Sequence, residues 1–144
     1  MSRRAHVMLV VLVGTFVEPA MGGGVMSPYA TERQLRQCLA RPANASTAAQ
    51  VECQAAAGKA YDRRMNLAYA ALLRRLSGPA AEKLRVAQRA WLRFRNANSE
   101  AGRALFATRQ GTIYSPIFAA GQIATVRDRA IVLETQLRIL AVDD

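Results

Sequence analysis

The side chains that could carry chemistry are few in this sequence of 144 residues. Its single histidine is His6, so the chain beyond it has no imidazole base, no Ser-His-Asp or Cys-His nucleophile and no histidine-based metal site. Nine carboxylates follow Glu18, and their scattered positions do not indicate the paired acids that glycoside hydrolysis requires. We therefore predict an interaction protein rather than an enzyme, with no catalytic residue, no cofactor and no metal.

Cys38 and Cys53 are the two cysteines of the chain. In an exported protein such a pair is more often bridged than free, and a bridge across this loop would stabilise the fold by roughly 3 kcal/mol. A redox function is the alternative, but the Cys-x-x-Cys spacing typical of it is missing. The pair therefore favours a structural disulfide.

The N-terminal segment has the pattern of a signal peptide. Arg3 and Arg4 precede an apolar run over residues 7–17, and small residues follow at positions 20 and 22. An uncleaved membrane anchor is the alternative, although 11 apolar residues fall short of the roughly 20 that span a bilayer. We predict a signal peptide over 1–22, a flexible N-terminus over 23–30 and a single helical domain over 31–144, with no stable membrane span after cleavage. The protein would then be periplasmic or secreted.

The charge of the predicted mature chain is strongly positive. Removing residues 1–22 takes away Arg3, Arg4, Glu18 and His6, which leaves 18 basic and 9 acidic side chains and a formal charge of +9. This charge favours acidic partners, such as anionic polymers of the bacterial envelope. Nucleic acid is a poorer candidate, because aromatic residues make up only 6% of the chain and are not clustered for base stacking.

Apolar residues recur at helical spacing along the rest of the chain. We expect helices over 31–41, 47–76, 79–107 and 116–142, the last two joined by a polar connection over 108–115. The predicted fold is all-α: an antiparallel three-helix bundle with a short extra N-terminal helix tethered by the disulfide. The inward stripes are Met65, Tyr69, Leu72 and Leu76; Leu84, Ala87, Trp91, Phe94, Ala101 and Leu105; and Ile123, Val126, Ala130, Leu133, Leu137 and Leu140.

Polar residues border these apolar stripes, and those that are buried need hydrogen-bond or charge partners. A charged group taken out of water is costly unless it is paired, so Asp62 is expected to bind Arg95 or Arg129. We predict a structural network that fixes the register of the helices. A ligand cleft is the alternative, although a bundle this narrow leaves little room for one. The predicted network consists of Asp62, Asn66, Gln88, Trp91, Arg95 and Arg129.

Several of these residues stand in a pattern that resembles the LprI-type lysozyme inhibitor N-terminal domain family. The similar positions are Cys53, Asp62-x-x-Met65-Asn66-x-x-Tyr69, Leu84-x-x-x-Gln88-Arg89-Ala90-Trp91-x-x-x-Arg95, Gly111-Thr112 and Arg129-x-x-x-Leu133. The resemblance runs from about Cys38 to Leu137 and implies a small helical protein exported to the bacterial envelope. It departs from the family at Asn96, where an aspartate is usual. It also departs at Ser99 and Gly121, where the family has the two cysteines of a further disulfide.

The resemblance implies inhibition of lysozyme by protein–protein binding. The candidate partner-binding loop contains Arg109, Thr112 and Tyr114, since a guanidinium can bind a catalytic carboxylate and a tyrosine can supply an apolar contact. Net positive charge opposes long-range attraction to a basic lysozyme, so recognition would depend on a local match to its acidic cleft.

The alternative function is binding of anionic envelope components or of a periplasmic partner. It is supported by a predicted basic outer surface, which could also be an ordinary solvated face. The surface consists of Arg64, Arg74, Arg75, Arg85, Arg89, Arg93 and Arg103.

Overall fold

A computed structural model of the protein describes residues 29–142. The predicted signal peptide, and the predicted flexible N-terminus up to residue 28, lie outside the described residues. Residues 29–142 are helical and contain no strand. The elements are α1 (Ala30–Leu39), the short 3-10 helix η1 (Pro42–Asn44), α2 (Thr47–Arg75), α3 (Gly78–Ala107) and α4 (Tyr114–Leu140). All four predicted helices are found, with ends within about two residues of those expected.

Local chemistry explains where the long helices begin and end. Ser46 caps α2, because its extended backbone directs the Oγ atom to accept a hydrogen bond from the Ala49 amide at 3.2 Å. Gly78 and Gly111 have φ angles of +54° and +108°, which side chains disfavour, and they stand at the two ends of α3. The chain therefore reverses direction on either side of this helix.

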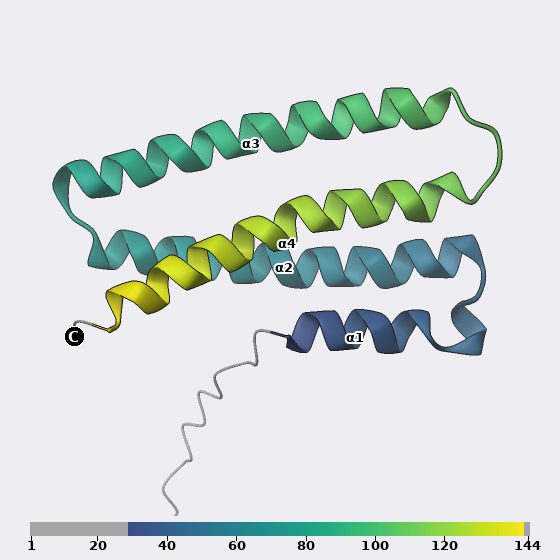
Figure 1. Ribbon diagram of the computed structural model, residues 1–144, viewed down its shortest axis with the longest axis horizontal. Coiled ribbons are helices and arrows are strands. Elements are labelled where there is room, and N and C mark those ends of the chain that lie inside the picture. Colours follow the sequence, from purple (N-terminus) through teal and green to yellow (C-terminus); the bar gives the residue numbers. More distant parts are fainter. Residues whose placement is uncertain (1–28, 143–144) are drawn as a thin grey trace, which may run out of the picture.

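The helices lie side by side along one long axis (Figure 1). The chain reverses after α1, so that α1 and α2 run in opposite directions, and α3 runs opposite to both α2 and α4. The most extensive contact joins α2 to α4, followed by the contact of α1 with α2, whereas α3 touches its neighbours much less. None of the helices within residues 29–142 is both long and apolar enough to cross a bilayer.

The buried core is formed by α2 and α4. Side chains at helical spacing on α2 meet those of α4, and Leu133 and Ala130 are fully shielded from solvent. Helix α3 packs partly buried side chains such as Leu84 and Trp91 against the margin of this core. The core cluster consists of Tyr61, Met65, Ala68, Leu72, Ile123, Ala130 and Leu133.

The expectation for the inward stripe of α3 is wrong over much of its length. Ala87 and Ala101 are exposed, and Phe94 and Leu105 keep 57% and 56% of their surface accessible. The helix is amphipathic as predicted, but α2 and α4 pack on each other and leave much of that apolar face uncovered. The molecule is therefore a close pair of helices, flanked by α1 and α3, rather than three equivalent rods.

The disulfide between Cys38 and Cys53 is present, as predicted, with a Cα–Cα separation of 5.8 Å. It joins the end of α1 to the first turns of α2 and closes the loop that contains η1. Asn44 supports the loop, because its Nδ2 atom donates a hydrogen bond to the carbonyl oxygen of Cys38 at 2.8 Å. The N-terminal helix is thus covalently tied to the core pair.

Candidate functional site

The connection between α3 and α4, residues 108–113, forms one end of the molecule (Figure 1). We call it the tip. Its backbone is held by hydrogen bonds: the amide of Arg109 donates to the carbonyl of Phe106 at 3.0 Å, and the hydroxyl of Thr108 donates to the carbonyl of Leu105 at 2.7 Å. Gly111 then turns the chain with its positive φ angle. The tip is therefore a short structured turn rather than a long loop.

The side chains of the tip face solvent. Arg109 and Thr112 are exposed, and Ile113 beside them keeps 54% of its surface accessible. None of the ion pairs within residues 29–142 includes Arg109. A positive charge and an apolar side chain are thus both exposed in the short turn at the end of the α3–α4 hairpin.

Three aromatic rings support the tip from below. Phe106 lies between Tyr114 and Phe118, with ring centroids 6.1 and 5.6 Å away. Gly102 permits the approach of the two helices, because a Cβ atom at that position would lie 2.7 Å from a ring carbon of Phe118. Tyr114 is half-buried in the first turn of α4. It therefore belongs to the base of the predicted binding loop, while Arg109 and Thr112 form its outer edge.

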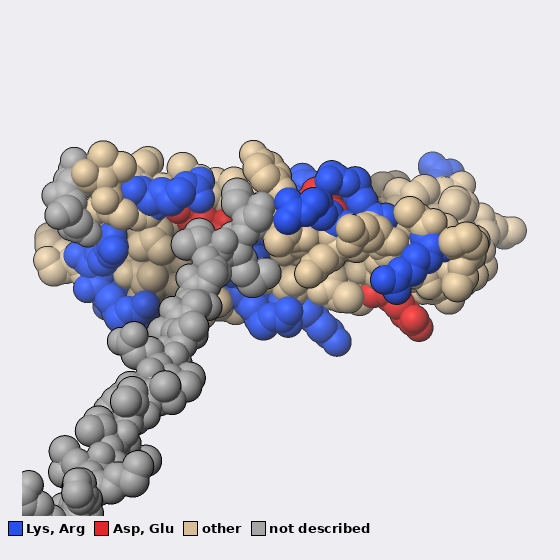
Figure 2. Space-filling model, turned by 90° about the horizontal axis from the view of Figure 1, so that it is seen from below, with Lys and Arg blue, Asp and Glu red and all other residues tan. Residues whose placement is uncertain are grey.

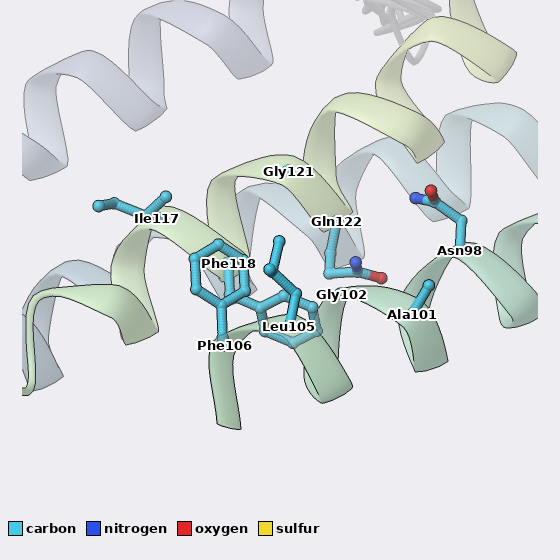
Figure 3. A pocket seen from close by; sticks show the side chains of 9 residues that line it. All are labelled: Asn98, Ala101, Gly102, Leu105, Phe106, Ile117, Phe118, Gly121 and Gln122. Carbon is cyan, nitrogen blue, oxygen red and sulfur yellow. The ribbon is translucent and has the colours of Figure 1, made fainter. Parts of the chain in front are cut away.

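A hollow of about 470 Å³ opens beside this base, between α3 and α4 (Figure 3). Leu105 and Ile117 give it apolar walls, and the amides of Asn98 and Gln122 lie toward its other end. Gly121 also lines the hollow and has open space where its side chain would be. Gly121 is one of the two positions where the family has a cysteine of a further disulfide and this chain does not. The other, Ser99, accepts a hydrogen bond from Arg103 at 3.0 Å.

The predicted polar network separates into distinct contacts. Gln88, which is almost completely buried, accepts a hydrogen bond from Nε of Arg129 at 3.0 Å and directs its own Nε2 toward the Met65 sulfur at 3.8 Å. On α3, the guanidinium of Arg95 lies over the Trp91 ring at 5.4 Å. The structure thus brings Gln88 and Arg129 together across two helices, and places Trp91 and Arg95 together within one.

The expected ion pair between Asp62 and Arg95 or Arg129 is not formed within residues 29–142 and is a wrong prediction. The Asp62 carboxylate instead accepts a hydrogen bond from Asn66 at 3.0 Å on the same helix. The reason is helical geometry: the buried positions of α2 fall one residue before Asp62 and Asn66, which turns both toward water. A solvated carboxylate needs no cationic partner.

The structure has a different charged cluster, which the sequence reasoning missed. Arg64 donates two hydrogen bonds to the Glu134 carboxylate, at 2.8 and 2.7 Å, and a third to Thr31 at 3.2 Å. The hydroxyl of Tyr61 donates to Glu32 at 3.3 Å, and the Arg64 guanidinium lies over the Tyr61 ring. These contacts join α1, α2 and α4. Arg64 was expected on the outer surface, and no local spacing signals a pair 70 residues apart.

The surroundings of this cluster shift the pKa values of its members. Burial raises the pKa of Tyr61, and the nearby Glu32 carboxylate raises it further. The hydrogen bonds that Arg64 donates to the Glu134 carboxylate raise the pKa of Arg64. Arg129 behaves differently, because burial lowers its pKa without a carboxylate to offset the effect. The Arg64 guanidinium therefore has a carboxylate partner, whereas the Arg129 guanidinium has none in the described part of the chain.

No group of three His, Cys, Asp or Glu side chains is placed to hold a metal ion within the described part of the chain. What the site offers is shape, one accessible guanidinium and apolar surface.

Comparison with known proteins identifies a matching family and a similar solved structure. Residues 38–133 match a family model described as "Lysozyme inhibitor LprI". The chain is also similar to the crystal structure of an uncharacterized protein from Burkholderia thailandensis, with 32% sequence identity and a TM-score of 0.72. That likeness covers 77% of this chain and 54% of the other, so the chain spans about half the length of the solved protein. No curated protein matches the chain.

Proposed function

The chain belongs to the lysozyme inhibitor LprI family, and from this membership we propose that it is an exported protein that inhibits lysozyme by protein–protein binding. The observation that carries the proposal is the match over residues 38–133, which includes both cysteines, the core of α2 and α4, and the tip. We propose that the protein binds its target without catalysing a reaction, in the periplasm or outside the cell.

The tip is the surface that suits this function best. A lysozyme cleft holds carboxylates at its base, and the Arg109 guanidinium can form paired charge-assisted hydrogen bonds with such a group. Ile113 adds apolar contact beside it, and the aromatic base formed by Phe106, Tyr114 and Phe118 limits the ordering cost of binding. We propose that Arg109 and Thr112 enter the cleft and that Tyr114 positions them from below.

The overall charge sets a condition on this mode of binding. The chain has a formal charge of +10, so a strongly basic lysozyme would be repelled at long range. Recognition would then depend on short-range contacts in the cleft. We expect the association rate with a basic lysozyme to rise with ionic strength, because salt screens the repulsion.

Inhibition assays with the purified protein and several lysozyme classes test the proposal. We expect stoichiometric loss of lysozyme activity, and at least about a tenfold weaker effect for Arg109→Gln, because one charge-assisted contact is removed. Arg74→Gln, an exposed arginine at the far end of α2, is the matched control and should inhibit normally. Full lysozyme activity in every class at excess protein would exclude the function. Equal inhibition by both variants would exclude the tip.

Binding of anionic envelope polymers is the alternative function. Figure 2 shows lysine and arginine side chains along the length of one face, with acidic side chains at few places. The predicted basic surface is nevertheless reduced, because Arg64 is paired with Glu134, and Arg85 and Arg89 share Glu82. Polymer binding that disappears at high salt, without any inhibition of lysozyme, would favour this alternative.

A further inference from the structure

A second groove lies between α3 and α4, closer to the middle of the helices than the hollow at the tip. It has a volume of about 420 Å³, and we call it the Arg129 groove. Trp91 and Phe94 line it from α3, and Arg129 and Val132 from α4. Phe94 and Val132 keep 57% and 45% of their surface exposed. Apolar side chains of this size on both walls make the groove suitable for a protein partner.

The charge inside the groove has no counter-ion. Nε of Arg129 bonds the amide oxygen of Gln88, but its Nη2 atom is buried and has no hydrogen-bond partner. None of the ion pairs within residues 29–142 includes Arg129. Asp128 also lines the groove, but its carboxylate pairs with Arg127 at 3.0 Å and not with Arg129. A half-buried guanidinium with only an amide to bind is costly, and an incoming carboxylate would offset that cost.

Arg95, on α3, also lacks a carboxylate partner among residues 29–142. Arg95 lies over the Trp91 ring, and the hydrogen bonds of its guanidinium go to the uncharged side chain of Asn96, at 3.1 and 3.3 Å. Two cations without carboxylate partners therefore stand at Trp91. A second copy of this chain would fit the groove poorly, because each copy has a formal charge of +10 and the two would repel.

We propose that the Arg129 groove is a docking site for an acidic amphipathic helix of another protein. The apolar side of that helix packs on Trp91, Phe94 and Val132 as a third helix laid between α3 and α4. A carboxylate of the helix enters the groove beside Arg129 and offsets the charge of its guanidinium. This surface is separate from the tip, so the proposal does not depend on lysozyme inhibition.

The test uses the full chain and a designed helical peptide of 18 residues that alternates leucine and glutamate at helical spacing. Trp91 is the only tryptophan of the protein, so its fluorescence reports directly on the groove, and calorimetry gives an independent affinity. We expect saturable binding that weakens as salt is added. A peptide with glutamine in place of each glutamate should bind at least about tenfold more weakly, because it loses the charge-assisted bond to Arg129.

Variants of the protein locate the binding site. Arg129→Gln keeps an amide that can bond Gln88 and should reduce affinity for the acidic peptide at least about tenfold. If that variant is poorly folded, Phe94→Ser provides the same test, because an exposed side chain can be changed without disturbing the core. Leu67→Ser is the matched control: Leu67 is 71% exposed on α2, and its replacement should not change binding.

Three results would overturn the proposal. The first is the absence of saturable binding up to millimolar peptide. The second is equal binding by the Phe94→Ser and Leu67→Ser variants. The third is a change in Trp91 fluorescence that depends on protein concentration alone, together with a dimer in sedimentation equilibrium that the Phe94→Ser variant lacks. That last result would assign the groove to a second copy of the chain.

Discussion

Helix α3 and the rest of the molecule differ in how far their side chains are buried or paired within the chain. The α1–α2–α4 region has a buried apolar core, a disulfide and the charged cluster around Arg64, in which the ionic groups bind partners within the chain. Arg129 of α4, at the junction with α3, is the exception. Helix α3 has 30 residues, yet only Ala81 and Gln88 are buried. We propose from this comparison that the first region supplies stability, and that α3 with its junctions to α4 supplies surface for recognition.

The largest expected effect comes from the same substitution made in the two regions. Leu133→Ala removes a fully buried side chain and should lower the free energy of unfolding by about 3–5 kcal/mol, because it leaves a cavity in the core. Leu105→Ala changes a side chain that is 56% exposed and should cost less than about 1 kcal/mol. Urea denaturation of both variants measures the difference. Equal losses would mean that α3 is as much a part of the core as α4.

Two acidic residues provide a second comparison, with a smaller effect. Glu134→Gln leaves Arg64 without its anionic partner, and we expect a loss of about 1–3 kcal/mol, reduced from the value for a fully buried pair because the two side chains are 14% and 21% exposed. Asp62→Asn should change stability by less than about 0.5 kcal/mol, since Asp62 bonds only Asn66 at the surface. The same denaturation measurement decides. A larger loss for Asp62→Asn would restore the predicted network.

Sequence periodicity was sufficient to predict where the helices lie. It was insufficient to predict which helix packs against which. Ser46, Gly78 and Gly111 define helix ends through local backbone chemistry, so those ends could be predicted. The apolar stripe through Phe94 could also be predicted, but a stripe states only that a face is apolar. Whether another helix covers it depends on how closely α2 and α4 pack, which is a property of the whole fold.

The candidate sites show the same limit. Arg109 and Thr112 could be placed at a solvent-exposed turn, because glycine and polar residues interrupt the helices there. The pairing of Arg64 with Glu134 could not, because it joins residues 70 positions apart whose neighbours in the sequence carry no matching signal. Asp62 was misassigned for a related reason: a shift of one residue on a helix, about 100°, separates a buried position from a solvated one.

The smallest predicted effect concerns pH and again belongs to the α1–α2–α4 region. Burial raises the pKa of Tyr61 in the folded protein, with Glu32 adding to the shift, whereas an unfolded tyrosine titrates near 10. The unfolded chain therefore loses this proton first, and stability that is present below pH 10 should decline as the pH rises through the pKa of the folded state. Urea denaturation between pH 9 and 11.5 should show this decline, and Tyr61→Phe should remove part of its slope. Tyr114→Phe, in the first turn of α4 beside the tip, is the matched control. If the two variants decline identically with pH, the Tyr61 hydroxyl is not held as tightly as its contact with Glu32 implies, and the electrostatic contrast between the two regions would be smaller than their packing suggests.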